Sequence, residues 1–262
     1  AFDTIDVDRH IPVTSVRNDR TFAVIIANEK YQSESLVDFA ANDGETFARY
    51  CTMTLGLPER NVRYFPNATL NNIRAQINWI GKVAAAYRGE ANLIVYYAGH
   101  GIPDEESKTA YLLPIDGYGS DVATGYELNE LYRRLGAMPA KSITVFIDAC
   151  FSGAQRSGQS LVSARGVAIK VDRGKPTGNT VVFSAAQGDE TAYPYREKKH
   201  GLFTYFLLRK LLETGGDATL EDLSEYVSRE VAQHSIVVNS KSQTPTVTPS
   251  PSMTNWQNLK LK

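Results

Sequence analysis

Short apolar runs alternate with amphipathic segments along most of the chain. Five runs have the length and the β-branched and aromatic content of strands: residues 22–27, 62–65, 93–97, 143–147 and 181–184. The central runs, such as LIVYY at 93–97, are continuously apolar instead of alternating with polar residues. This pattern is typical of parallel strands that are covered by helices on both faces.

Between these strands, apolar residues recur with the spacing of helices. The segments are residues 47–55, where Phe47, Tyr50, Cys51 and Leu55 share a face; residues 70–87; residues 202–212; and a helix that begins at Thr219 and Asp222 with a capping-box-like pattern. Strand alternating with helix predicts an α/β fold with a mainly parallel central sheet and helices on both faces, an α/β/α sandwich. We expect one domain over residues 21–262 after an N-terminal extension of residues 1–20.

Three segments depart from this periodicity. Residues 102–125 are polar and are predicted to hold a small hairpin around residues 110–113. Residues 151–180 are rich in Gly, Ser and basic residues, and residues 239–252 are rich in Ser, Thr and Pro. Long irregular segments of this kind are usually functional or disordered.

Composition and charge exclude several classes of function. The 262 residues carry a net charge of −1, which offers no electrostatic reason to expect nucleic acid or an anionic membrane as a partner. No run approaches the roughly 18 apolar residues of a membrane span. The chain starts at Ala1 without a signal-like segment, so we interpret it as a soluble processed form or excised domain; its compartment is not indicated.

The cysteines and histidines show no metal-site or disulfide pattern. Two cysteines are too few for a disulfide framework, and neither C-x-x-C nor H-E-x-x-H spacing occurs. Taken singly, Cys51 is expected in a helix core. His10, His200 and His234 are expected to be solvated.

Two strand ends nevertheless combine a histidine with a cysteine. The run at 93–97 leads into Ala98, Gly99 and His100, and the run at 143–147 leads into Asp148, Ala149 and Cys150. In open α/β sheets, active crevices form at the carboxyl ends of the strands. Imidazole can act there as base or cation for a thiolate, so the pair predicts nucleophilic catalysis.

The motifs YYAGHG and, fifty residues later, DACFSG resemble the paired signatures of caspase-like cysteine peptidases, closest to the metacaspase branch. FAVIIAN at 22–28, the Asn42-Asp43 pair and GLFTY at 201–205 match this family in order, so that the similarity covers residues 21–261. The resemblance implies a caspase-like fold and cysteine endopeptidase activity.

The resemblance also implies roles for individual residues. Cys150 would be the nucleophile and His100 the general base and acid, while the backbone N–H groups of Gly101 and Cys150 would form the oxyanion hole. No third side chain is named to orient His100, because a backbone carbonyl can serve in this family.

Asp43 and Asp148 occupy the positions that line the primary substrate pocket in metacaspases, with Ala98 where relatives often have Ser. Two carboxylates would pair with a guanidinium or ammonium group and repel an acid, which favours cleavage after Arg or Lys. An alternative for Asn42 or Asp43 is capping of the helix that begins there, and both roles can hold at once.

The segment after Cys150 carries basic residues that an enzyme of this specificity could cut in itself: Arg156, Arg165, Lys170, Arg173 and Lys175. Calcium, which many metacaspases bind, is not favoured, since residues 153–168 contain no acid and Asp116 and Asp121 are typical of solvated loop residues. No other cofactor is expected.

Two alternative functions stay open. The chain could be a caspase-fold scaffold or binding module without activity, although an inactive site has no physical need to keep His100 and Cys150 together. It could also be a legumain-like or gingipain-like cysteine hydrolase with a different pocket.

Overall fold

The computed structural model describes residues 4–153 and 171–262. Within them, a six-stranded sheet has the order β11-β8-β7-β3-β1-β2. Its strands are β1 (Thr21–Ala27), β2 (Val62–Pro66), β3 (Asn92–Ala98), β7 (Ser142–Asp148), β8 (Thr180–Ser184) and β11 (Thr246–Pro249). The first five pair in parallel, and β11 is antiparallel to β8. All five strands expected from the apolar runs are confirmed.

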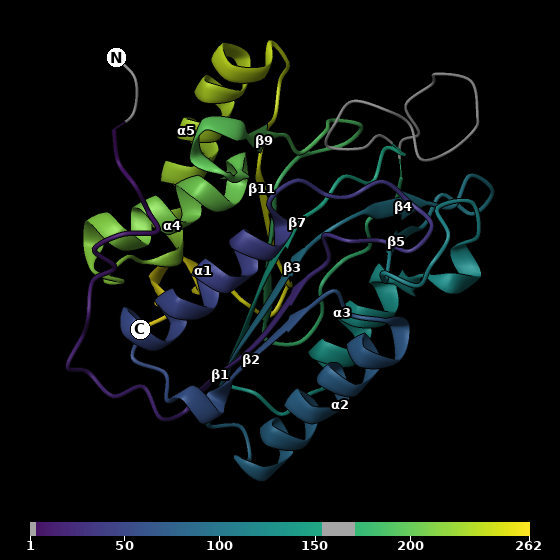
Figure 1. The fold of residues 1–262 in the computed structure, drawn as a ribbon. Coiled ribbons are helices and arrows are strands. Elements are labelled where there is room, and N and C mark those ends of the chain that lie inside the picture. The colour runs from purple at the N-terminus through teal and green to yellow at the C-terminus, as the bar shows by residue number, and fades with distance from the viewer. Residues whose placement is uncertain (1–3, 154–170) are drawn as a thin grey trace.

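Helices cover both faces of this sheet (Figure 1). One face carries α1 (Ala40–Met53), α4 (Leu202–Thr214) and α5 (Leu220–Asn239), and the other carries α2 (Leu70–Ala86) and α3 (Leu128–Gly136). Alternate residues of β1 enter the two cores, with Ile25 facing α1 and Val24 facing α2. The prediction of an α/β/α sandwich is confirmed.

Smaller sheets and 3-10 turns lie outside the central sheet. They are β4 (Gly101–Pro103), β5 (Ala110–Leu112) and β6 (Tyr126–Glu127), which pair antiparallel; β9 (Pro194–Tyr195) with β10 (His200–Gly201); and the 3-10 turns η1 (Glu59–Asn61), η2 (Val122–Thr124), η3 (Arg196–Lys198) and η4 (Trp256–Asn258). The hairpin expected near residues 110–113 is confirmed, since Ile102 pairs with Tyr111.

The N-terminal cap predicted for one helix is confirmed, and the cap predicted for another differs in the structure. The Thr219 hydroxyl accepts the Asp222 N–H at 3.1 Å and the Asp222 carboxylate accepts the Thr219 N–H at 3.1 Å, which confirms the capping box of α5. At α1 the N-cap residue is Phe39, which has no side-chain cap. Instead, a Glu29 carboxylate oxygen accepts the Ala41 N–H at 2.9 Å, so neither Asn42 nor Asp43 is the N-cap residue, although Asp43 lies in the first turn of α1.

Two elements were not expected. The interpretation of residues 239–252 as wholly irregular was wrong, because β11 lies within them; the partly exposed edge strand TVTP forms on the open edge of β8, which only the tertiary fold supplies. Helix α3 does carry a helical stripe, Leu128, Leu131 and Leu135, but at nine residues it is short.

The N-terminal segment, which is described from residue 4 onward, packs against α1 and α4. Val7 and Ile11 are buried in the core shared with α1 and α4. The Tyr50 hydroxyl donates to the Val7 carbonyl at 2.9 Å, and the Thr54 hydroxyl donates to the Pro12 carbonyl at 2.7 Å. The segment therefore runs along the α1 and α4 side of the molecule (Figure 1).

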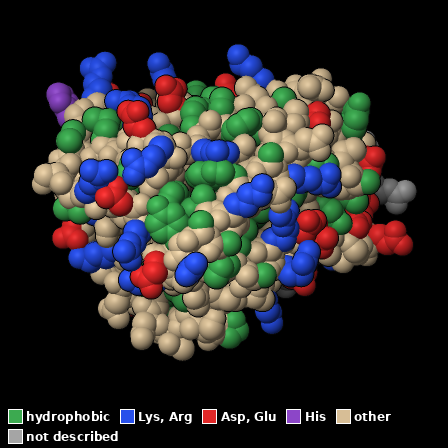
Figure 2. Space-filling view, turned by 90° about the horizontal axis from the view of Figure 1, so that it is seen from below, with side chains coloured by type: hydrophobic (Ala, Val, Ile, Leu, Met, Phe, Trp, Pro, Cys, Tyr) green, Lys and Arg blue, Asp and Glu red, His purple; other side chains and the backbone are tan. Residues whose placement is uncertain are grey.

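The surface bears on partners in two respects. Basic and acidic side chains are interspersed on the face that Figure 2 shows, so the basic residues there do not merge into one patch that would bind a polyanion. Among the described residues, no helix has the length and apolar character needed to cross a membrane.

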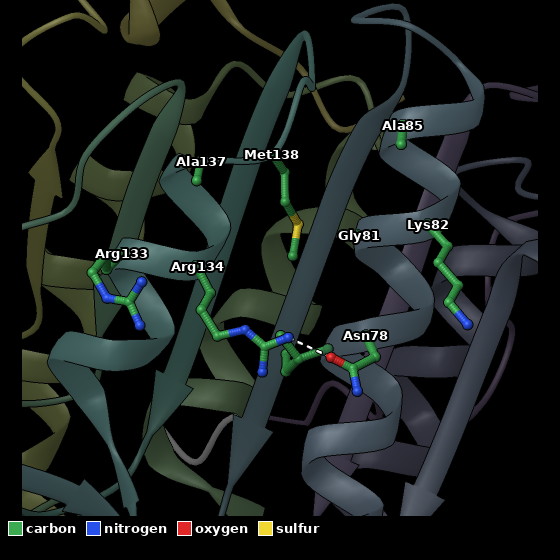
Figure 3. A pocket seen from close by; sticks show the side chains of 9 residues that line it. Asn78, Gly81, Lys82, Ala85, Arg133, Arg134, Ala137 and Met138 are labelled. Carbon is green, nitrogen blue, oxygen red and sulfur yellow. Dashed lines mark hydrogen bonds between the residues drawn. The ribbon is translucent and has the colours of Figure 1, made fainter.

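A groove of about 520 Å³ separates α2 from α3, with Met138 between the two helices (Figure 3). The basic side chains along it do not converge: an Arg134 guanidinium N–H donates to the Asn78 side chain, and Lys82 extends from α2 away from that bond. Helices α2 and α3 end just before β3 and β7 begin. The end of the groove near Ala85 and Ala137, at the top of Figure 3, therefore lies toward the amino ends of the strands.

Two glycines inside helices offer a matched test of packing. A Cβ at Gly44 in α1 would lie 2.5 Å from the Ala27 Cβ and 2.9 Å from the Tyr64 ring, whereas at Gly81 in α2 it would meet only the flexible end of Met138 at 3.2 Å. We expect Gly44→Ala to destabilise the protein by about 1–3 kcal/mol in urea unfolding. Gly81→Ala should be neutral or stabilising by up to about 1 kcal/mol through helix propensity. Equal stability of the two variants would contradict this account of how α1 packs on the sheet.

Candidate active site

The ends of β3 and β7 lie side by side in register. Ala98 pairs with Asp148, and the Gly99 N–H donates to the Asp148 carbonyl at 3.3 Å. His100 and Cys150 each follow their strand by two residues and are both only 4% exposed. A Cβ at position 101 would lie 2.5 Å from the Cys150 carbonyl oxygen, so this close approach requires Gly101. The structure thus brings the His100 and Cys150 turns together.

His100 is held by groups from the loop after β1 and from β3. Its Nε2 lies 2.8 Å from the Ser35 carbonyl oxygen, which can only accept, so Nε2 carries the proton and Nδ1 is the ring atom able to act as a base. The His100 backbone N–H donates to the Tyr31 hydroxyl at 2.8 Å, and the two rings lie 4.6 Å apart. A Tyr97 hydroxyl donates to the His100 carbonyl at 2.7 Å.

Neither Tyr31 nor Ser35 was singled out in the sequence. The Ser35 carbonyl that orients the imidazole is a backbone group, and any residue type could supply it. The sequence therefore carries no signal for this contact.

The Cys150 thiol contacts the segment that follows β8. The Ala192 N–H donates to the sulfur at 2.9 Å, and the sulfur lies 3.5 Å from the Ala192 carbonyl. An N–H directed at sulfur stabilises a thiolate. Cys51 differs: it is fully buried in the α1 core, and burial raises the pKa of its thiol well above the usual range. The expectation that Cys51 is a core residue is confirmed.

Asp148 ends β7 and is fully buried. One of its carboxylate oxygens accepts the Thr204 hydroxyl at 2.7 Å, and that hydroxyl also lies 2.6 Å from the Tyr96 hydroxyl. Thr204 belongs to the first turn of α4. Ala98 is also buried, beside Asp148 in the sheet.

Asp43 is fully buried as well and reaches the same helix end. Both of its carboxylate oxygens accept the Gly201 N–H, at 3.0 and 3.1 Å, immediately before α4. The positive end of the α4 dipole therefore lies beside Asp43 and Asp148 alike. The structure brings the two carboxylates to one helix N-terminus, although α1 and β7 are distant in the chain.

The interpretation of His200 as a solvated side chain was wrong. His200 is fully buried, with Nδ1 2.8 Å from Asp43 and Nε2 3.1 Å from Asp8. Burial lowers the pKa of His200, but the hydrogen bonds and charges of Asp43 and Asp8 outweigh it and raise the pKa to about 9. The available signal was its position just before the strongly apolar helix of residues 202–212.

The other two histidines differ in exposure. His10 is exposed, as expected, whereas His234 is half-buried with its ring 4.7 Å from that of Phe206. The expectation of a solvated His234 therefore holds only in part.

The basic residues considered as self-cleavage sites lie in different environments. Arg156, Arg165 and Lys170 lie outside the described residues. Arg173 donates to the Ala186 and Gly188 carbonyls and lies over the Phe151 ring, and burial lowers its pKa. Lys175 is exposed.

The acids considered for calcium have structural partners. Asp116 accepts the Leu70 N–H at the start of α2, and Asp121 accepts the Ala123 N–H in η2, both at 3.0 Å. Among the residues that the structure describes, no group of three or more His, Cys, Asp or Glu side chains could hold a metal ion. That calcium is possible but not favoured stays a prediction.

Comparison with known proteins identifies the family. The family model of the caspase domain matches residues 20–254, and the chain belongs to this family of caspase-like cysteine peptidases. A search of curated proteins found no match.

Two solved structures are similar in fold. Caspase-1 from Spodoptera frugiperda is 18% identical with a TM-score of 0.62, and the match covers 94% of this chain and 92% of that one. Protein GSU0716 from Geobacter sulfurreducens is 18% identical with a TM-score of 0.64, covering 92% and 97%. Both confirm the caspase-like fold.

Proposed function

We propose that this protein is a cysteine endopeptidase that cleaves after Arg or Lys, with Cys150 as nucleophile and His100 as general base and acid. The observation that carries the proposal is the joint position of the two residues after adjacent, in-register strands, with the His100 Nε2 proton committed to the Ser35 carbonyl. Membership of the caspase domain family supports the same chemistry.

The proposed reaction proceeds in two steps. His100 Nδ1 takes the Cys150 proton, the sulfur attacks the scissile carbonyl carbon, and the Gly101 and Cys150 N–H groups stabilise the oxyanion. His100 then protonates the departing amine, which leaves a thioester on Cys150. Water, deprotonated by His100, attacks this thioester and releases the acid and the thiol.

The two buried carboxylates support a basic specificity. Asp43 and Asp148 gather at the N-terminus of α4, beside the turn that bears Cys150. A substrate guanidinium or ammonium would be attracted to this charge, whereas an acidic side chain would be repelled. Ala98, next to Asp148 in the sheet, would add an apolar wall.

Loss of either member of the dyad should abolish turnover. We expect Cys150→Ala to remove peptide hydrolysis and His100→Ala to lower kcat/KM by several orders of magnitude, since thiolate formation and leaving-group protonation both fail. Cys51→Ala should retain kcat/KM and lose only about 1 kcal/mol or somewhat more of stability. Turnover by folded Cys150→Ala would rule out the assignment, and a folded but inert wild type would favour the scaffold alternative.

Specificity can be measured with peptides that differ only in the residue before the scissile bond. Peptides with Arg or Lys should be cut and those with Asp, Glu or Asn should not. Asp148→Asn keeps the shape of the side chain but removes its charge, so kcat/KM for the Arg peptide should fall by about 2–3 kcal/mol in transition-state binding, roughly 30- to 150-fold. Asp121→Asn, in η2, is the matched control and should not change it. Preference for Asp would show that the pocket is misassigned, and preference for Asn would favour a legumain-like enzyme.

Self-processing between Arg156 and Lys175 is a further part of this proposal. Arg173 is a poor cleavage site because its guanidinium is bound by two carbonyls and covered by Phe151. A cut at Arg156, Arg165, Lys170 or Lys175 is therefore favoured. A tethered segment next to the nucleophile has a high effective concentration, which favours cleavage within one molecule.

Purified wild-type protein should convert into two fragments that remain associated, at a rate independent of protein concentration. Mass spectrometry should place the cut after one of those four residues, and Cys150→Ala should stay intact. An uncut wild type that hydrolyses peptides would exclude self-processing as a requirement for activity.

A further inference from the structure

Three side chains in contact, Asp8, His200 and Asp43, connect the N-terminal segment to the proposed pocket. Asp8, His200 and Asp43 come from the N-terminal segment, β10 and α1, and the imidazole lies between the two carboxylates, 3.1 Å from Asp8 and 2.8 Å from Asp43. Asp43 also accepts the Gly201 N–H, so its carboxylate is held from both the ring and the start of α4. Asp8 is anchored in turn by the Thr46 hydroxyl at 2.8 Å.

We propose that His200 is the positioning residue for the Asp43 carboxylate, and that Asp8 makes the N-terminal segment a functional part of the substrate pocket. This inference rests on the proposed function, in which Asp43 lines that pocket.

The geometry fits a doubly protonated ring. An imidazolium donates from both nitrogens, one to each carboxylate, whereas the neutral ring has a single N–H and can donate to only one of them. The Asn42 amide group has two N–H donors: it donates to the Lys199 carbonyl at 2.9 Å and also hydrogen-bonds Asp8, and its nitrogen lies 3.2 Å from Nε2. Asp43 is therefore held by His200 Nδ1 and the Gly201 N–H, while Nε2 ties the same ring to Asp8.

Of the three side chains, only that of Asp8 is exposed to solvent in this structure. The Asp8 side chain is 35% exposed, and His200 and Asp43 are fully buried. A cleft of about 620 Å³ between residues 4–9 and residues 197–199 is lined in part by Asp8. In the described part of the chain, the charged and titratable groups around Asp8 and His200 are Asp6, Arg9, Asp43, Arg49, Tyr50, Glu197, Lys198, Lys199 and Tyr205.

The direction of the pH dependence follows from the raised pKa. His200 has a pKa of about 9 in the folded protein, against 6.5 ordinarily. Its stabilising bonds are thus fully present below about pH 6.5 and are lost as the pH rises through about 9. Because those bonds go to Asp8 and Asp43, and not to the His100 and Cys150 pair, deprotonation should change KM for a basic substrate more than it changes kcat.

Asp8→Asn separates this role from a merely structural one. It retains the size of the side chain but removes one of the two charges that hold the proton, so the pKa of His200 should fall by about one unit or more. Asp19→Asn is the matched control, since Asp19 is also in the N-terminal segment but pairs with Arg17 and Arg60. It should leave the pKa of His200 unchanged.

The titration of His200 can be measured without relying on peptidase activity. We would follow the imidazole signals by NMR in the Cys150→Ala background, where self-processing is blocked, and assign His200 by the signal lost in His200→Gln. Should that variant not fold, substituting His10, His100 and His234 in turn leaves His200 as the remaining signal. A His200 that titrates below about pH 7, or that does not shift in Asp8→Asn, would overturn the inference.

Kinetics of the active enzyme provide the second measurement. The substrate should carry Arg, because a guanidinium does not titrate below about pH 12 whereas Lys does. The change in KM expected near pH 9 in the wild type should move to lower pH in Asp8→Asn by the same interval as the NMR titration, and Asp19→Asn should match the wild type. A KM profile that does not move would overturn the pocket role of His200 while leaving peptidase activity intact. A wild type that cuts no peptide would defeat the proposed function, and the NMR result would still stand by itself.

Discussion

The in-register parallel pairing of β3 with β7 is the constraint on which the rest of the site depends. Because Ala98 lies opposite Asp148, the two strands end level, and the turns that bear His100 and Cys150 must emerge at the same place. A slip of one residue would exchange the two faces of β7. Such a slip would move Asp148 away from α4. It would also move Cys150 relative to Gly101, whose contact with the Cys150 carbonyl leaves no room for a Cβ.

The polar interior at this end of the sheet is organised by the start of α4. Charged groups are costly to bury unless they are paired or hydrogen-bonded. Asp43 and Asp148 satisfy that condition through Gly201, Thr204 and His200, all contributed by residues 200–204. The same short segment therefore supports both carboxylates proposed for specificity, which links the stability of the domain to the chemistry of its pocket.

The sheet and the helices that pack on it could be predicted because their signals are local. Continuous apolar runs mark β3 and β7, and the Thr219 capping box marks the start of α5. Strand β11 escaped prediction since a Pro-containing Thr-rich stretch becomes a strand only where β8 presents an open edge. That the turns bearing His100 and Cys150 lie side by side was predictable for the same local reason, as each residue follows a recognisable strand end.

The sequence by itself thus determined the α/β sandwich and the meeting of His100 with Cys150, since periodicity and strand-end position are written in consecutive residues. The tertiary structure decided what surrounds that pair. The Ser35 carbonyl that orients His100 is 65 residues away in the chain, and the partners of His200 are 157 and 192 residues away. These contacts join ordinary polar groups of loops and termini, where no period or motif marks a partner. A lone histidine in a loop looks solvated until the fold encloses it between two carboxylates, which is why His200 was misjudged from the sequence.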